Sequence, residues 1–301
     1  METLFQGLES GAGLDVVLWL QAHSSPALDK LAIALSVLGG FIVYLLLFMA
    51  LYWSVDKRLA KQFLLALILS GVCIAAFKLA FQRPRPFIFA PDRVYVLLAE
   101  GTYGLPSGHV GITVAVLGVL ASAARWRWAW VALALYVALM GWARMVVGVH
   151  YPQDVLLGLL IGLLTLVIVR QEWNTLRRLW ARVLLLVRVL LLALASALLL
   201  VFLAGDPFDV LIAGVIFGAG IGVMVEGRWV RFSTAGSRSQ RILRTVVGLL
   251  VVALVLGTLV GLGRPFASVV IAQAAVSALL GFLVTAVYPW LAVRIDLAQS
   301  L

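Results

Sequence analysis

The chain has 301 residues, of which 64% are hydrophobic and only 12% are charged, and its mean hydropathy is +1.11. This composition excludes an ordinary soluble globular domain. The formal net charge of +10 is of a size found in nucleic-acid-binding proteins. However, the basic residues lie mostly in loops between apolar runs, so we expect no nucleic-acid partner. The single cysteine, Cys73, can form no intrachain disulfide and excludes a metal site built from several thiolates.

Apolar runs long enough to cross a bilayer recur along the whole chain, since about 20 helical residues span its hydrocarbon core. They predict an all-α, polytopic membrane protein with about nine transmembrane helices. The expected spans are 29–53, 62–81, 108–124, 128–147, 153–169, 183–204, 208–225, 243–262 and 267–290. A shorter amphipathic piece, Leu14–Ala22, is expected to lie along the membrane interface before the first span.

The basic residues are distributed unequally between the two sets of alternate loops. The richer set holds Lys57, Arg58, Lys61, Arg125, Arg127, Arg170, Arg177, Arg178, Arg182, Arg188, Arg228, Arg231, Arg238, Arg241, Arg244 and Arg294. The poorer set holds Lys30, Lys78, Arg83, Arg85, Arg93, Arg144 and Arg264. The positive-inside rule assigns the richer set to the cytoplasm, which places the amino terminus outside and the carboxyl terminus inside. Anionic lipid headgroups are the expected neighbours of the cytoplasmic loops.

Three short motifs meet on the outer surface, where several basic residues oppose the topology bias. The first motif runs from Lys78 to Pro86 and reads K-x6-R-P. The second is Pro106-Ser-Gly-His109, and the third runs from Arg144 to Asp154 and reads R-x5-H-x3-D. Charged residues placed against the bias near a membrane need a functional reason.

The cations of these motifs suit a phosphoryl group. The planar forks of Arg85 and Arg144 match phosphate oxygens, and Lys78 adds a point charge. Ser107 and Gly108 precede the third span, so the free N–H groups of that helix start are expected to point at the same anion. Glycine at this position lets the backbone approach closely.

The two histidines of the motifs supply covalent and acid–base chemistry. His150 and Asp154 are four residues apart, so a helical turn places both on one face. Asp154 is expected to accept a proton from one ring nitrogen of His150 and leave the other free to attack phosphorus. His109 is expected to protonate the leaving oxygen and then to activate water. This scheme requires no metal and no cofactor.

The three motifs resemble the signature of the type 2 phosphatidic acid phosphatase superfamily, the membrane lipid phosphate phosphatases. The resemblance covers about residues 12–170. It implies that His150, His109 and Asp154 are catalytic, and that Lys78, Arg85, Ser107, Gly108 and Arg144 bind the substrate phosphate.

Two residues beside the motifs are unusual. Ala143 stands where that family usually has a serine before the arginine, which removes one hydroxyl hydrogen bond but no principal catalytic group. Arg83 is an additional cation next to the first motif. A contact with a headgroup or a loop is favoured for it, and a second phosphate of a pyrophosphate substrate is the alternative.

The sequence predicts a phosphatase core over residues 12–170 and an additional transmembrane region of unknown role over residues 171–301. Within that region Gly214, Gly218 and Gly222 recur every four residues, as Gly158 and Gly162 do in the core. This spacing favours close packing within the molecule, while a homodimer stays open. Glu226 is expected to be a solvated loop residue.

The leading hypothesis is a metal-independent phosphoric monoester hydrolase of the bacterial cytoplasmic membrane, with its active site facing the periplasm or exterior. Its substrate would be a lipid phosphate ester or an isoprenyl pyrophosphate, hydrolysed through a phosphohistidine. One alternative is a phosphatase of a soluble sugar phosphate, similar to glucose-6-phosphatase. The other is a lipid transporter with a phosphatase-like core, although the apolar centres of the last four spans count against it.

Overall fold

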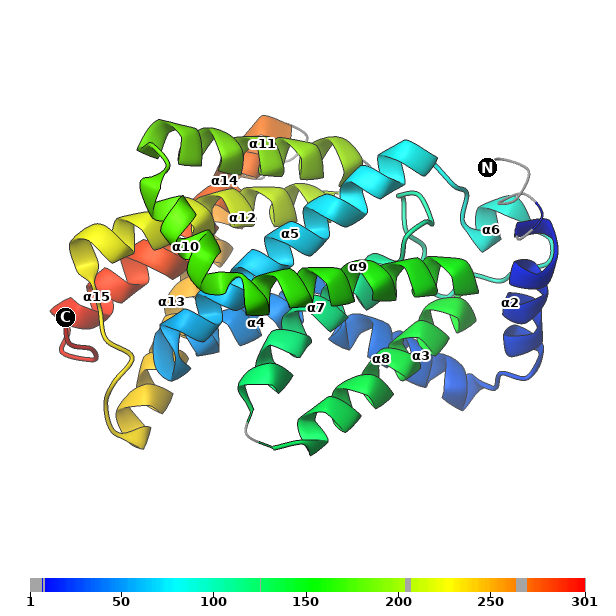
Figure 1. The fold of residues 1–301 in the computed structure, drawn as a ribbon, viewed down its shortest axis with the longest axis horizontal. Coiled ribbons are helices and arrows are strands. Elements are labelled where there is room, and N and C mark those ends of the chain that lie inside the picture. Colours follow the sequence, from blue (N-terminus) through cyan, green and yellow to red (C-terminus); the bar gives the residue numbers. More distant parts are fainter. Residues whose placement is uncertain (1–6, 8, 125, 204–206, 264–269, 301) are drawn as a thin grey trace. The chain divides into compact units, whose positions relative to one another are not determined.

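The computed structural model describes residues 7, 9–124, 126–203, 207–263 and 270–300. Over these residues the protein is built from helices (Figure 1). One isolated antiparallel bridge joins Phe232 and Ser300. The predicted all-α class is therefore confirmed. Arg125 and Arg264, which were used to predict the topology, lie outside the described residues.

The chain divides into two compact units, each of which is formed by two separate segments of the sequence. The first consists of Met1–Tyr44 and Gln62–Trp173, and the second of Leu45–Lys61 and Asn174–Leu301. Two helices, α4 (Phe41–Ala50) and α5 (Lys57–Phe81), therefore belong partly to each unit. The predicted domain boundary at residues 170 and 171 stays a prediction.

The first unit carries all three sequence motifs at helix ends. Its other helices are α2 (Ala12–Ala22), α3 (Pro26–Leu38), α6 (Pro86–Phe89), α7 (Gly108–Ala123), α8 (Trp128–Val146) and α9 (Pro152–Gln171). Prolines occupy the first positions of α3, α6 and α9, where their missing N–H costs no intrahelical hydrogen bond. The starts of these helices are thus fixed by local sequence.

Glycines bring α7 and α9 into backbone contact (Figure 1). A Cβ atom on Gly158 would lie 2.5 Å from the carbonyl oxygen of Ser107, and one on Gly162 would lie 2.5 Å from that of Gly111. No larger residue fits at such distances without moving one helix. The start of α7 is consequently held against the first turns of α9.

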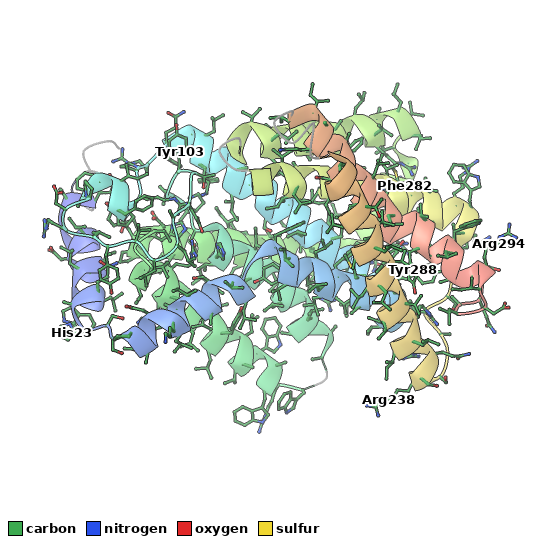
Figure 2. The ribbon with its side chains drawn as sticks, turned by 180° about the vertical axis from the view of Figure 1, so that it is seen from behind. His23, Tyr103, Arg238, Phe282, Tyr288 and Arg294 are labelled. Carbon is green, nitrogen blue, oxygen red and sulfur yellow. The ribbon has the colours of Figure 1, made fainter. Side chains whose placement is uncertain are left out.

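The second unit is formed by the later helices and by three single-turn π-helices. The helices are α10 (Trp173–Arg182), α11 (Leu185–Leu203), α12 (Pro207–Val225), α13 (Arg238–Gly263), α14 (Val270–Phe282) and α15 (Tyr288–Arg294). The π-helices are η1 (Leu51–Val55), η2 (Glu226–Val230) and η4 (Leu283–Val287). Tyr288, at the start of α15, donates a hydrogen bond to the carbonyl of Arg244 in α13 (Figure 2).

The glycine series of α12 packs within this unit. A Cβ atom on Gly218 would lie 1.8 Å from the carbonyl oxygen of Ala278 in α14, and one on Gly222 would lie 2.0 Å from Thr285 Oγ1. Small residues allow two helix backbones to approach in this way. Intramolecular packing, the favoured interpretation of the spacing, therefore accounts for these glycines, and a homodimer stays a prediction.

Glu226 is a buried residue, and its expected place in a solvated loop is wrong. Its carboxylate accepts hydrogen bonds from Tyr52 Oη at 3.0 Å, from Lys57 Nζ at 2.7 Å and from the Phe232 amide at 3.0 Å. The π-helical turn that begins at Glu226 directs this side chain inward. A buried carboxylate persists when it is paired and hydrogen-bonded in this manner.

The predicted number of nine spans is not confirmed. Each of the nine predicted segments contains a helix, but residues 29–53 are interrupted by a turn at Gly39 and Gly40, and the helix in the segment 183–204 begins only at Leu185. Among those residues, six helices are long and apolar enough to cross a membrane, or eight when two bent helix pairs are each counted as one span. The pairs are α3 with α4 and η1, bent by 48°, and α10 with α11, bent by 120°. The 16-residue α7 is shorter than the usual span, at about 24 Å.

Replacing Gly158 with alanine tests the contact between α7 and α9. The added methyl would meet the Ser107 carbonyl at 2.5 Å, so we expect the variant to lose about 1–3 kcal/mol of stability by overpacking. The measurement is the midpoint of thermal unfolding in detergent. Gly257→Ala is the control because a Cβ there meets nothing within 4 Å. Equal midpoints for the two variants would contradict the described packing.

Candidate active site

Five helix ends and one loop form the candidate site in the first unit. The carboxyl ends of α5 and α8 contribute Lys78 and Arg144, and the starts of α6, α7 and α9 lie beside them. The loop between α6 and α7, residues 90–107, carries Tyr103 (Figure 2). The three motifs, distant in sequence, are therefore brought together as predicted.

Arg85 is fully buried at the start of α6 and contacts both the loop and the third motif. Its Nε donates to the Thr102 carbonyl at 2.6 Å, and Nη2 donates to Thr102 Oγ1 at 2.9 Å. Its Nη1 donates to the Val149 carbonyl at 2.9 Å and lies 3.3 Å from His150 Nε2. These contacts fix the guanidinium plane next to the histidine ring.

The other two predicted cations reach the same loop. Lys78 Nζ donates to Thr102 Oγ1 at 2.9 Å and to the Tyr103 carbonyl at 2.6 Å. Arg144 is 1% exposed and forms an ion pair through Nη2 with Glu100. The same Glu100 carboxylate pairs with Arg85 Nη2 at 2.7 Å. Both buried arginines thus converge on one carboxylate.

The start of α7 presents donors to this cluster. Ser107 is the residue before the helix, and its amide donates to the Asp154 carbonyl at 2.9 Å. Its hydroxyl is buried and has no hydrogen-bond partner within the described residues, and the same holds for Arg144 Nε. A side chain on Gly108 would meet only Ile74, at 3.8 Å. The Ser107 hydroxyl and Arg144 Nε are therefore unpaired donors, and Gly108 leaves room for an anion.

His150 and Asp154 form a buried pair at the start of α9. Asp154 Oδ2 lies 3.2 Å from His150 Nδ1 and accepts a hydrogen bond from the Tyr151 amide at 2.9 Å. Because the aspartate binds the Nδ1 side of the ring, the Nε2 atom faces Arg85. The spacing of four residues predicts that both side chains lie on one face, and the contact between them agrees with that prediction.

The imidazole of His150 is held in its neutral form by its surroundings. Burial, together with the positive charges of Arg85 and Arg144, holds the pKa of His150 well below its usual range, although Glu100 opposes this effect. The pKa of Glu100 would be raised by burial alone, but Arg144 and Arg85 outweigh burial and hold it well below its usual range. The site thus contains a neutral histidine beside an ionised glutamate.

His109 lies in the first turn of α7, on the open side of the cluster. Its side chain is 25% exposed, and Nδ1 lies 3.8 Å from Glu100 Oε1, which is too far for a hydrogen bond. A Cβ on Gly39 in the α3–α4 turn would lie 3.5 Å from the ring. His109 is therefore the more accessible of the two histidines.

The two residues noted beside the motifs have separate environments. Arg83 forms an ion pair with Glu9, with Nε donating to Oε1 at 2.7 Å. Glu9 is a helical residue, so this ion pair is neither the headgroup or loop contact favoured for Arg83 nor the alternative contact with a second phosphate. Ala143 is fully buried in an apolar cluster with Ala32, Leu35 and Val147.

One functional residue of the site escapes sequence reasoning. Glu100 belongs to no motif and has no characteristic spacing from the arginines, since a loop without regular structure carries it. An acidic residue in the segment between the first and second motifs is the only signal that the sequence offers. Among the described residues, no group of three or more His, Cys, Asp or Glu side chains is placed to hold a metal ion.

Comparison with known families gives matches to two parts of the chain. Residues 59–178 match the PAP2 superfamily, and residues 210–300 match the transmembrane extension of PAP2 superfamily phosphatases. The two matches together cover most of the chain, and the protein therefore belongs to the PAP2 superfamily. The second match also shows that residues 210–300 correspond to a recognised extension of this family.

Three individual proteins are similar to parts of this chain, and two of them are named as phosphatases. Lipid phosphate phosphatase delta from Arabidopsis thaliana is 30% identical over 168 residues, which are 51% of this chain but only 40% of that protein. The crystal structure of Aquifex aeolicus LpxE is 29% identical, with a TM-score of 0.50 over 55% of this chain and 98% of its own. A PAP2-type phosphatidylglycerolphosphate phosphatase from Bacillus subtilis is 20% identical, with a TM-score of 0.48, over 55% of this chain and 86% of its own.

The lowered pKa of His150 predicts that its ring stays neutral on mild acidification. A folded-state pKa below the usual value of about 6.5 means that protonation begins only at lower pH. With three histidines in the chain, ring resonances of histidine-labelled protein can be assigned with single-histidine variants. We expect the His150 resonance to remain at its neutral position between about pH 8 and pH 6. A titration centred at or above about pH 6.5 would contradict the described surroundings.

Proposed function

We propose that the protein hydrolyses a lipid phosphate monoester or pyrophosphate through a phosphohistidine, at the outer face of the membrane. The observation that carries the proposal is the convergence of Arg85 and Arg144 on one carboxylate beside His150 Nε2. Two arginine forks directed at one set of oxygens are the arrangement that binds a phosphoryl group. Lys78 and the Ser107 hydroxyl border the same cluster.

In the first step His150 Nε2 attacks the terminal phosphorus, and the bond from this phosphorus to the oxygen of the leaving group breaks; the leaving group is a lipid alcohol for a monoester and a lipid monophosphate for a pyrophosphate. Asp154 holds the Nδ1 proton, which orients the ring and stabilises its positive charge as the P–N bond forms. His109, when protonated, gives its proton to the departing oxygen. Arg85, Arg144, Lys78 and the α7 amides stabilise the charge on the equatorial oxygens.

In the second step water hydrolyses the phosphohistidine. His109, now neutral, takes a proton from water as the water oxygen attacks phosphorus, and the P–N bond breaks. Inorganic phosphate leaves, and both histidines return to their starting forms. No step of this cycle uses a metal ion.

Several features favour an amphiphilic substrate. The cluster lies at the ends of helices that are long and apolar enough to span a membrane, so a lipid tail can stay in the bilayer while its headgroup reaches the arginines. The Arabidopsis relative carries the name of a lipid phosphate phosphatase. The excess of basic residues in the opposite loops supports the outward orientation of the site.

The test is release of inorganic phosphate by detergent-purified protein in the presence of EDTA. The substrates are isoprenyl pyrophosphate, phosphatidic acid, sphingosine phosphate and glucose 6-phosphate. We expect release from a lipid, and a loss of about 10³-fold or more in His150→Ala and about 10²-fold or more in His109→Ala. Loss of activity with EDTA, or full activity in either variant, would contradict the mechanism.

His23→Ala is the matched control, because His23 is exposed at the end of α2 and its ring contacts Trp19 of the same helix. It should retain the activity of the unmodified protein. Exclusive hydrolysis of glucose 6-phosphate would replace the lipid with a soluble substrate. No release from any substrate would favour a transporter with a phosphatase-like core.

A further inference from the structure

Glu100 occupies the centre of the proposed phosphate-binding cluster. One carboxylate oxygen lies 2.7 Å from Arg85 Nη2, and the other pairs with Arg144 Nη2 and lies 3.8 Å from His109 Nδ1. Glu100 is the only carboxylate that pairs with either arginine among the described residues. Its side chain is 27% exposed, whereas both arginines are buried. An anion that enters from the surface therefore meets Glu100 before it reaches the guanidinium groups.

The carboxylate and a substrate phosphate need the same donors. Two oxygens of either group fit the pair of guanidinium groups, and the pair cannot bind both groups in this manner at once. Glu100 sits in the loop of residues 90–107, which has no helix or strand. Glu100 can therefore be exchanged for another anion by movement of the loop, without breaking regular secondary structure.

We propose that Glu100 is a specificity-determining residue, which holds Arg85 and Arg144 in the resting protein and yields them to dianionic phosphate groups but not to monoanionic phosphodiesters. The inference rests on the proposed function, because it concerns the same arginines. In this role the Glu100 carboxylate competes with incoming anions for the two arginines. The phosphodiester headgroups of ordinary phospholipids, which surround the protein in a membrane, are thereby kept out of the site.

The charge difference provides the selection. A phosphate monoester carries a charge of about −1.5 to −2 near pH 7, and the carboxylate carries −1, as a phosphodiester does. Exchange of one monoanion for another gains little Coulomb energy. Exchange for a dianion gains more, since Arg85, Arg144 and Lys78 are buried and their interactions are weakly screened. Because the pKa of Glu100 is held low, the competitor stays charged when the medium is mildly acidic.

Binding of two lipids with identical tails tests the proposal without requiring turnover. Dioleoyl phosphatidic acid is the monoester and dioleoyl phosphatidylglycerol is the phosphodiester, each titrated into detergent micelles while the thermal unfolding midpoint is recorded. For the unmodified protein we expect phosphatidic acid to bind at least about tenfold more tightly. For Glu100→Gln we expect phosphatidylglycerol to bind at least about tenfold more tightly than it binds the unmodified protein.

Asp92→Asn is the matched control, since it removes one negative charge from an exposed position of the same loop. It should leave both affinities unchanged. An unchanged affinity of Glu100→Gln for phosphatidylglycerol would overturn the inference, and so would an equal increase in Asp92→Asn. Should Glu100→Gln not fold, Glu100→Asp takes its place, because it keeps the charge but withdraws it by one methylene. It is expected to bind phosphatidylglycerol at least about threefold more tightly than the unmodified protein, and unchanged binding again overturns the inference.

Turnover separates this inference from the proposed function. If the unmodified protein hydrolyses no lipid phosphate, the proposed function fails, while the binding comparison still decides the role of Glu100. If it hydrolyses phosphatidic acid, an excess of phosphatidylglycerol should inhibit Glu100→Gln and spare the unmodified protein. Equal inhibition of the unmodified protein and of Glu100→Gln would overturn the role of Glu100 and leave the proposed phosphatase function intact.

Discussion

The structure of the first unit depends on an anion for two buried arginines. Arg85 and Arg144 are at most 1% exposed, at the ends of apolar helices, where an unpaired charge is costly. The Glu100 carboxylate, the Thr102 loop atoms and the Val149 carbonyl supply their partners. The loop of residues 90–107 is therefore held by the cations, and under the proposed function a substrate phosphate takes over some of these contacts.

The surrounding helices determine the position of the cluster formed by Arg85, Arg144 and Glu100. Prolines fix the starts of α6 and α9, and glycines press α7 against α9, so the amide end of α7 and the His150–Asp154 pair stand beside the arginines. These prolines and glycines act locally, and together they bring the three short motifs into one place. Preorganised charges of this kind are the main source of stabilisation for a transferring phosphoryl group.

Much of the site could be predicted from the sequence because its residues occur at fixed short spacings. The interval of four residues between His150 and Asp154 predicts that their side chains meet on one helix face. The Pro-Ser-Gly-His motif predicts the start of a helix. Glu100 could not be predicted, because an irregular loop places it by contacts rather than by periodicity. Glu226 was misassigned for a related reason: a π-helical turn, which has no simple sequence pattern, directs it inward. The number of spans also depends on bends and on the short α7, which hydropathy alone does not resolve.

The covalent intermediate on His150 is the central claim, and the stereochemistry at phosphorus tests it most directly. A phosphorothioate analogue of a hydrolysed lipid phosphate, with different isotopes in its two non-bridging oxygens, is cleaved in water that carries the third isotope. Two successive in-line displacements, first by His150 and then by water, predict net retention of configuration in the released thiophosphate. Net inversion would show that water attacks the substrate directly and would contradict the phosphohistidine.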